Sequence, residues 1–485
     1  MIPALFRIAP DDSTATALRD MAAGEEALGV TLAGPVAKGH KVAVKPIAAG
    51  EPVLKFGFPI GLATRAIAPG EHVHTHNVAT ALGGGGDYAF TPAARAPARI
   101  EGPAFLGYRR ADGRVGTRNE IWVIPTVGCV ARTAQKIAER AAALHPGKID
   151  GIHAFPHPFG CSQLGDDLQG TRAILAALAS HPNAGGVLIV GLGCENNQIR
   201  GMLEEIDHPN LRTLGAQMAD DEVEEGLALV AELVEGACAE RTPAPFPELV
   251  LGVKCGGSDG FSGLTANPLV GRMADAVTAA GGTAILTEIP EIFGAEQLLM
   301  ARARDEAVFA AIVTLVNDFK AYFTRHGEPV SENPSPGNIA GGITTLEEKS
   351  LGAVQKAGHA IVTDVIAYGG RVRRHGLTLL EAPGNDAVSS TALAAAGATA
   401  ILFTTGRGTP LGFPVPTIKI ASNHDLATRK PGWIDFDAGR VLEDGMESAA
   451  DALLEAIAAI ASGRETAAER NGEREIAIWK RGVTL

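Results

Sequence analysis

From residue 107 onward, short apolar runs alternate with longer segments that have the amphipathic spacing of helices. The apolar runs predict strands at residues 121–127, 151–155, 187–192, 248–253, 283–288, 360–367 and 399–404. The segments between them predict helices at residues 131–144, 168–179, 220–238, 268–280 and 295–323. Strands and helices that alternate in this way form parallel sheets with helices on both faces.

The first 78 residues have a different pattern. Short apolar runs are separated there by turns at Ala37-Lys38-Gly39, Ala48-Ala49-Gly50 and Ala68-Pro69-Gly70. This pattern predicts a small all-β domain, and residues 13–25 are compatible with one added helix.

Two stretches divide the chain further. Residues 79–105 contain four consecutive glycines and a segment rich in proline and alanine, which is typical of a linker. A second stretch rich in proline and glutamate, residues 242–248, separates two α/β regions. We therefore expect a β domain at 1–78, a linker at 79–105, a first α/β domain at 106–245 and a second at 246–485.

Composition narrows the class of protein. A chain of 485 residues with 46% hydrophobic and 20% charged residues has an ordinary globular balance and is too long for one compact core. A net charge of −13 without a basic tract argues against a nucleic-acid partner. We also expect no membrane partner, because no signal sequence and no apolar run of about 20 residues is apparent. Five cysteines, an odd number, are expected to be reduced in a cytoplasmic protein.

Four of the five cysteines follow strand-like runs, in glycine-containing turns. Cys129, Cys161, Cys194 and Cys255 share this position, whereas Cys238 lies inside a predicted helix. Ligands bind at the carboxyl ends of strands in open α/β sheets, and thiolates are ligands of soft metals. The pattern predicts a metal site, although a single cysteine is often just a small buried hydrophobe.

Other polar residues stand in similar positions. The segment His72-Val73-His74-Thr75-His76 would place its histidines on one face of a strand, as metal ligands or as a solvated edge. The loop Cys255–Gly260 offers backbone N–H groups to an anion, and Arg407 could clamp a carboxylate. Glu288 and Glu291 follow another strand, and each is either a base or an exposed loop charge. The glycine-rich loop 333–342 is too long for a simple spacer.

Several common sites are excluded. The turn Gly191-Leu192-Gly193-Cys194 lacks the Lys-Ser/Thr ending of a phosphate loop, and neither paired CxxC motifs nor a Gly-x-Ser-x-Gly elbow is present. Separated thiols favour an open metal centre. Three thiolates on an iron–sulfur cluster would leave one iron free for substrate. The alternative is a single Fe²⁺ or Mn²⁺ held by histidines and carboxylates.

Long motifs resemble a known family, the altronate/galactarate dehydratases of sugar-acid catabolism. The resemblance covers nearly the whole chain and rests on the motifs GHKVA at 39–43, GEHVHTHN at 70–77, RVGTRNE at 114–120, PTVGCV at 125–130, CSQLGDD at 161–167, GLGCENNQ at 191–198, CGGSDGFSG at 255–263, NPSPGN at 333–338 and 403–410. The His-rich segment, CSQLGDD, ENNQ and the chain's last residues are most similar to the altronate branch.

The resemblance implies a small SAF (β-clip) domain on an α/β body. It also implies dehydration of D-altronate to 2-keto-3-deoxy-D-gluconate with dependence on iron or manganese. Galactarate, a sulfolactate-lyase reaction and a catalytically silent sugar-acid-binding protein remain alternatives, and a homo-oligomer is compatible with the sequence.

Loss of water from a 2,3-dihydroxy acid requires removal of the C2 proton and departure of the C3 hydroxyl. We expect iron to act as the Lewis acid. The candidate roles are as follows: Cys129, Cys161 and Cys194 hold the iron; His157 or Glu288 is the base; Arg407 with Gly256, Gly257, Ser258 and Asp259 binds the carboxylate; and His74 and His76 complete the metal site or protonate the leaving hydroxyl.

Overall fold

The computed structural model describes residues 3–93 and 102–484. The N-terminal part is all-β, as the turn pattern predicted. Its strands are β1 (Leu5–Phe6), β2 (Thr14–Ala17), β3 (Glu26–Ala27), β4 (Val30–Thr31), β5 (Lys41–Ala43), β6 (Pro52–Lys55), β7 (Phe58–Ala63), β8 (His72–Val73) and β9 (Val78–Ala79). They form antiparallel sheets in the orders β1-β2-β5-β8 and β6-β7-β9, with a β3–β4 hairpin.

The helix proposed within residues 13–25 is wrong. Thr14–Ala17 is strand β2, paired on one side with β1 and on the other with β5. All four of its residues are buried. Threonine is β-branched and favours a strand, and pairing on both sides outweighs the weak helical spacing of this segment.

The described part of the predicted linker is fastened to the second α/β domain. Ala81 N donates to the Glu347 carboxylate at 2.7 Å, and Gly86 N donates to Asn317 Oδ1 at 3.2 Å. Residues 94–101 of the predicted linker lie outside the described residues. Residues 80–93 therefore follow the body rather than span free solvent.

The first α/β domain is built on a parallel sheet of order β13-β12-β14-β15. Its strands are β12 (Glu120–Pro125), β13 (Gly151–Ala154), β14 (Ala184–Gly191) and β15 (Leu211–Gly215), and its helices are α1 (Ala131–Leu144), α2 (Gly165–Ala179), α3 (Ile199–Leu203) and α4 (Glu222–Gly236). Alternate residues of β12 serve the two faces: Ile121 and Val123 share a core with α1 and α4, whereas Trp122 and Ile124 face the larger core that includes α2.

A small antiparallel sheet joins the two α/β domains. It has the order β11-β10-β16 and consists of β10 (Phe105–Arg109), β11 (Val115–Gly116) and β16 (Thr242–Ala244).

The second α/β domain is built on seven parallel strands in the order β19-β20-β18-β17-β21-β22-β23. They are β17 (Val250–Cys255), β18 (Thr283–Leu286), β19 (Val362–Ile366), β20 (Gly376–Leu380), β21 (Ala400–Thr405), β22 (Thr417–Ala421) and β23 (Phe436–Asp437). The strand order reverses between β17 and β21, which is where open α/β sheets bind ligands.

Ten helices of the described chain belong to this domain: α5 (Ala266–Ala279), α6 (Glu296–Met300), α7 (Glu306–Arg325), α8 (Pro336–Ala340), α9 (Leu346–Ala353), α10 (Asp386–Ala395), α11 (His424–Arg429), α12 (Val441–Asp444), α13 (Met446–Ala461) and α14 (Ala467–Arg470). The predicted single helix 295–323 is two helices, α6 and α7, because the Asp305 side chain caps a new helix by accepting from Val308 N.

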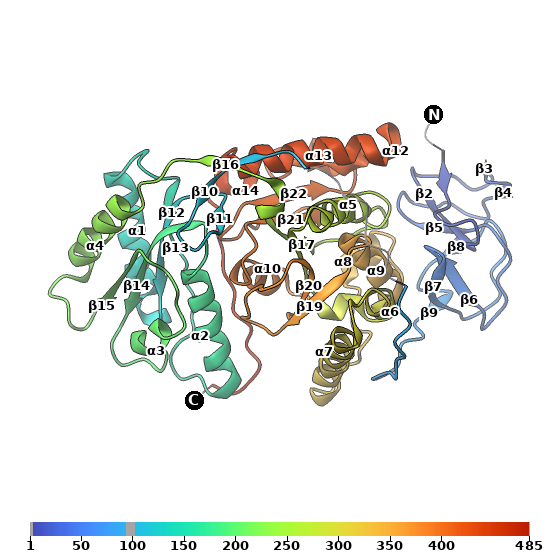
Figure 1. Ribbon diagram of the computed structural model, residues 1–485. Helices are drawn as coiled ribbons and strands as arrows, with labels where there is room; N and C mark the ends of the chain where they lie inside the picture. Colours follow the sequence, from blue (N-terminus) through green and yellow to red (C-terminus); the bar gives the residue numbers. More distant parts are fainter. Residues whose placement is uncertain (1–2, 94–101, 485) are drawn as a thin grey trace.

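Figure 1 shows the second α/β domain in the middle, between the N-terminal β domain and the first α/β domain. The chain's last segment returns to the first α/β domain, where the buried Asp167 of α2 accepts hydrogen bonds from Arg481 N and Gly482 N. The buried Arg118–Glu469 ion pair, at 2.8 Å, also joins the two α/β domains.

Helix α7 is long and apolar enough to cross a membrane by length and composition alone, with a mean hydropathy of 1.3. In the fold, Val308, Ile312, Val316 and Phe319 are buried on one face of the helix. Their spacing of three or four residues is that of a helix covering a protein core.

Candidate active site

A cluster of charged side chains is buried at the carboxyl ends of β17 and β18. Lys254, in β17, binds the carboxylates of Glu288 and Asp386 through its Nζ. Lys356 Nζ lies 2.6 Å from Glu288 Oε2 and 2.8 Å from Cys255 Sγ. Apolar strands therefore deliver ammonium, carboxylate and thiol groups to one point of the sheet edge.

Burial and charge act in opposite directions in this cluster. Burial alone would raise the pKa of Glu288, but Lys254 and Lys356 outweigh it and lower the pKa to about 2. Burial and the Glu288 carboxylate raise the pKa of the Cys255 thiol to about 12. Burial would lower the pKa of both lysines, yet the neighbouring acidic groups hold it above the usual value. The favoured state is a thiol, a carboxylate and two ammonium groups.

Glu288 has a left-handed backbone conformation, with φ of 64°. Such a conformation costs about 1–3 kcal/mol for a residue other than glycine and is often found at functional sites. Here it turns the chain after β18 so that the Glu288 side chain meets Lys254 and Lys356 and also accepts from Cys255 N at 3.1 Å.

A pocket of about 380 Å³ opens beside this cluster. Its wall consists of Cys255, Gly256, Gly257, Glu291, Asn333, Ser335, Asn338, Lys349, Gly384, Asn385, Asp386, Ala387 and Leu411. Lys349 Nζ donates to Glu291 Oε1 and to Asn333 Oδ1, both at 2.9 Å. The pocket thus combines an acid, a base and amide groups in a space suited to a small polar molecule.

Three residues of this site could hold a metal ion. One ligand atom each from Cys255, Glu288 and Glu291 lies within 4.8 Å of the others, and no second such group occurs among residues 3–93 and 102–484. The same residues already contact lysine ammonium groups. A cation would therefore have to displace those contacts or bind with loss of lysine or thiol protons.

The predicted substrate-binding residues divide into two groups. Gly256 and Gly257 line the pocket. Asp259, in contrast, is an internal acceptor for Ser262 and Ser422 hydroxyls, and Ser258 accepts from Asn338 Nδ2 through its carbonyl. Asp259 and Ser258 thus shape the loop.

Arg407 is exposed, and its Nη1 donates to Gly337 O at 3.1 Å. It links the turn after β21 to the loop 333–342. Asn333, Ser335 and Asn338 line the pocket. The predicted loop 333–342 is not all loop, because its residues 336–340 form the short helix α8.

The structure places the other predicted metal ligands elsewhere. Cys129, Cys161 and Cys194 are exposed at the edge of the four-stranded sheet, and none of them lines the pocket beside Cys255. His157 is buried, and its Nε2 lies 2.8 Å from Pro125 O while its Nδ1 accepts from Phe159 N. Both ring nitrogens of His157 are therefore engaged with backbone groups.

The predicted histidines do gather, together with a fourth, His40. The ring centroids of His72 lie 5.5 Å from those of His74 and 5.4 Å from those of His76, and His40 Nδ1 lies 3.1 Å from His72 Nε2. A turn brings them together, because β8 ends at Val73. Burial lowers the pKa of His72 and of His74 to about 4, so both rings are neutral at pH 7.

The histidine cluster belongs to the N-terminal domain and faces the second α/β domain, where His74 Nδ1 lies 3.0 Å from Thr344 Oγ1. The three exposed cysteines lie in the domain at the opposite end of the molecule (Figure 1). Within one chain, the structure therefore does not bring His74 together with those cysteines, although the sequence had suggested that they share one ion.

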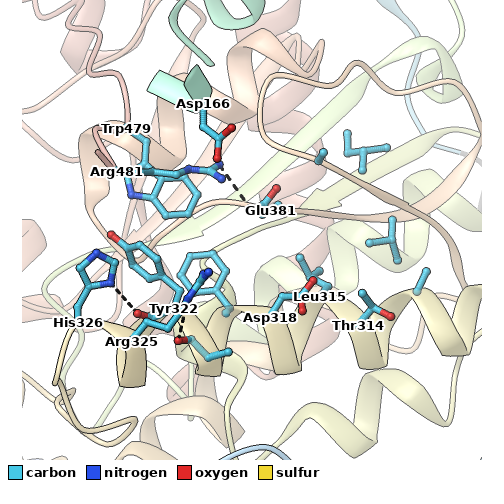
Figure 2. Close-up of a pocket in the computed structure, with 16 residues that line it drawn as sticks. Asp166, Thr314, Leu315, Asp318, Tyr322, Arg325, His326, Glu381, Trp479 and Arg481 are labelled. Atoms are coloured by element: carbon cyan, nitrogen blue, oxygen red, sulfur yellow. Dashed lines mark hydrogen bonds and ion pairs between the residues drawn. The ribbon is translucent and has the colours of Figure 1, made fainter. Parts of the chain in front are cut away.

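A larger cavity of about 970 Å³ lies between α7, the start of α2 and the C-terminal segment. Figure 2 shows Arg481 pointing toward Glu381, which it approaches to 3.6 Å, and His326 directed at the backbone of Tyr322. Arg481 also covers the Trp479 ring at 3.7 Å. These contacts hold the C-terminal segment against the body.

Sequence reasoning missed the three lysines of the site. The position of Lys254 could have indicated a functional role, because it is a charged residue immediately before Cys255 at the end of an apolar run. Lys349 and Lys356 gave no such indication, because they lie in a segment with an ordinary mixture of charged and apolar residues.

Three family models together match nearly the whole chain. The altronate/galactarate dehydratase SAF domain matches residues 3–81, the second domain of D-galactarate dehydratase/altronate hydrolase matches 107–238, and the C-terminal domain of D-galactarate/altronate dehydratase matches 246–484.

Curated relatives agree with these models. A protein named altronate dehydratase from Escherichia coli (strain K12) is 50% identical, with 98% of each chain covered. A protein of the same name from Bacillus subtilis (strain 168) is 49% identical over 99% of each chain. Galactarate dehydratase (L-threo-forming) from Escherichia coli (strain K12) is 33% identical over 90% of this chain and 88% of its own.

Proposed function

The chain belongs to the altronate/galactarate dehydratase family, and on this basis we propose that it dehydrates D-altronate to 2-keto-3-deoxy-D-gluconate. Identity near 50% to two altronate dehydratases, against 33% to a galactarate dehydratase, supports altronate over galactarate. The observation that carries the choice of site is the Glu291–Lys349 pair in the wall of the pocket beside Cys255.

In this proposal the Glu291 carboxylate takes the proton from C2 of the substrate. Glu288 is the poorer base, because Lys254 and Lys356 hold its pKa near 2 and bind both of its oxygens. The Lys349 ammonium gives a proton to the C3 hydroxyl as the C3–O bond breaks, so that water leaves. The enol that remains becomes the 2-keto acid by moving its hydroxyl proton to C3.

Glu291 and Lys349 can return to their starting protonation states after each turnover. Glu291 has gained one proton and Lys349 has lost one, and their 2.9 Å hydrogen bond lets the proton return directly. Gly256 and Gly257 have no side chains, which leaves room for the substrate to approach these groups.

Iron or manganese held by Cys255 and Glu288, with Glu291 left free as the base, would neutralise the charge that develops on the substrate carboxylate. The proximity of their ligand atoms supports this position. The metal's identity as iron rests on the family resemblance. We also propose a cytoplasmic location, which the free state of all five cysteines supports.

The test is an assay for 2-keto acid with D-altronate, galactarate and sulfolactate, each with and without Fe²⁺. We expect product from D-altronate and a decrease in kcat of about 10²- to 10⁴-fold in Glu291→Gln, the range for loss of a general base. Asp318→Asn is the matched control, because Asp318 is exposed in the larger cavity. Tight binding of altronate without keto product would contradict the proposal, as would turnover of galactarate alone.

A further inference from the structure

Three exposed thiols lie at one edge of the first α/β domain, and the reaction proposed above makes no use of them. Cys129 follows β12 in the 3-10 helix η1 (Gly128–Val130), Cys161 lies in the loop after β13, and Cys194 lies in the turn after β14. These strands are neighbours in the order β13-β12-β14 and run parallel. Their carboxyl ends therefore bring the three thiols to adjacent points of one edge.

Hydrogen bonds join the three cysteine loops to one another. Gly128 N donates to Phe159 O at 2.8 Å, which ties the Cys129 turn to the Cys161 loop. Asn197 N donates to Gly160 O at 2.9 Å, and Asn196 Oδ1 accepts from Ser162 N at 2.8 Å. The Cys194 turn is thereby tied to both sides of Cys161, and the three loops form one connected surface.

The loops can approach one another closely because glycine precedes Cys161 and Cys129. Gly160 has a φ of 102°, and a Cβ atom there would lie 2.1 Å from Thr126 O. A Cβ atom at Gly128 would lie 3.0 Å from the backbone of Pro158. Larger residues would push the loops apart, so the Gly-Cys pairs hold the thiols close to neighbouring backbone.

Polar donors accompany the thiols. Gln217 Nε2 lies 3.5 Å from Cys194 Sγ, and Ser162 Oγ lies 4.0 Å from Cys161 Sγ. Cys129 stands just before α1, where the free N–H groups of a 14-residue helix favour negative charge. Hydrogen-bond donors around the sulfurs are typical of cysteines that bind metal as thiolates.

We propose that Cys129, Cys161 and Cys194 bind an iron–sulfur cluster and leave one of its irons without a cysteine ligand. A single ion needs its donors close together, and these thiols form no group within 4.8 Å among the described residues. In a cluster each thiolate binds its own iron, so the sulfurs stand farther apart. The site lies outside the pocket beside Cys255 and does not depend on the proposed reaction.

The experiment counts reactive thiols and bound iron in the full-length protein. The metal-free protein has four exposed cysteines and one buried one, so four thiols should react rapidly with a disulfide reagent such as Ellman's reagent. After anaerobic reconstitution with Fe²⁺ and sulfide, only Cys238 should react rapidly. Bound iron with acid-labile sulfide and a broad visible absorption band should appear together.

Variants separate the site from nonspecific iron binding. Cys161→Ser and Cys194→Ser should each abolish the absorption band and leave the remaining exposed thiols reactive. Cys238→Ser should retain the cluster. In its metal-free form the number of rapidly reacting thiols should fall from four to three. Thermal unfolding of each metal-free variant checks that it is folded. Four rapidly reacting thiols after reconstitution, or an unchanged band in Cys161→Ser, would overturn the proposal whatever the activity with altronate.

Discussion

The two parallel sheets of this protein end in cysteines at equivalent positions, yet the two edges have opposite environments. Cys129, Cys161 and Cys194 are exposed at the edge of the four-stranded sheet. Cys255, at the end of β17 in the seven-stranded sheet, is 2% exposed and contacts Lys356. The same strand-to-turn position therefore produces accessible thiols in one domain and a buried, protonated thiol in the other.

The difference comes from what covers each edge. Residues 346–357, which form α9 and the following 3-10 helix, place Lys349 and Lys356 over the seven-stranded edge. Both lysines are buried and bind Glu291 and Glu288 respectively. The loops of the four-stranded edge tie to one another but leave their thiols open to solvent. A covered edge suits proton transfer between buried groups, and an open edge suits a cofactor assembled from outside.

The largest effect is expected where the covered edge loses a charge. Lys356→Met leaves Glu288 and Cys255 without one ammonium partner, and breaking a buried ion pair costs about 3–5 kcal/mol. The free energy of unfolding, measured by urea denaturation, should fall by that amount. Lys136→Met, at an exposed position of α1, is the control and should change it by less than about 0.5 kcal/mol. Equal losses of unfolding free energy in Lys356→Met and Lys136→Met would contradict a special role of buried charge at the covered edge.

Acid should affect the covered edge more than the open one. Glu288 has a pKa near 2 in the folded protein and an ordinary value of 4.5, so its stabilising effect is present above pH 4.5 and is lost as the pH falls toward 2. The loss attributable to Glu288 is about 3 kcal/mol, at 1.36 kcal/mol per pKa unit. Unfolding free energies measured between pH 5 and pH 2 should therefore fall less steeply in Glu288→Gln than in the wild type.

The open edge supplies the control for that measurement. Cys161→Ser should keep the wild-type dependence on pH, because Cys161 contacts no carboxylate of the buried cluster. A slope for Glu288→Gln equal to that of the wild type would show that the acid sensitivity arises elsewhere.

The smallest effect is expected from the exposed thiols themselves. Substitution of an exposed side chain that makes few contacts changes stability by about 0.5 kcal/mol or less, so Cys161→Ser should unfold at nearly the wild-type urea concentration. Their reactivity should nevertheless differ sharply from that of Cys255. In metal-free protein at pH 8, iodoacetamide should modify Cys129, Cys161 and Cys194 but not Cys255, whose pKa is raised to about 12 by burial.

Peptide mass spectrometry identifies the alkylated residues. Modification of Cys255 should begin only when urea unfolds the second α/β domain. Rapid modification of Cys255 in the native protein would contradict the burial on which the comparison rests.

Much of the architecture followed from local pattern. Apolar runs located β12, β14, β17, β18 and β21, because strands buried on both faces are continuously apolar. They also located the half-buried edge strands β13 and β19. The pattern failed at β2, where pairing with two neighbouring strands decided the structure of residues 14–17. It also merged α6 with α7, since the break depends on the cap at Asp305.

The candidate site was only partly visible in the sequence. Gly256 and Gly257 were expected to bind substrate and do line the pocket. Glu288 and Glu291 were both named as possible bases. Two lysines bind the Glu288 carboxylate, and of the two glutamates only Glu291 is in the pocket wall. Lys356 lies 101 residues from Cys255, so no local pattern could join them.

The sequence by itself determined the parallel sheets, the small β domain and the arrival of four cysteines at strand ends, because hydrophobic runs and glycine turns act over a few residues. Only the tertiary structure decided that Cys255 is buried among lysines and carboxylates while Cys129, Cys161 and Cys194 face solvent. That outcome depends on which distant segments cover each sheet edge, and the burial and charge they impose fix the protonation state of each thiol.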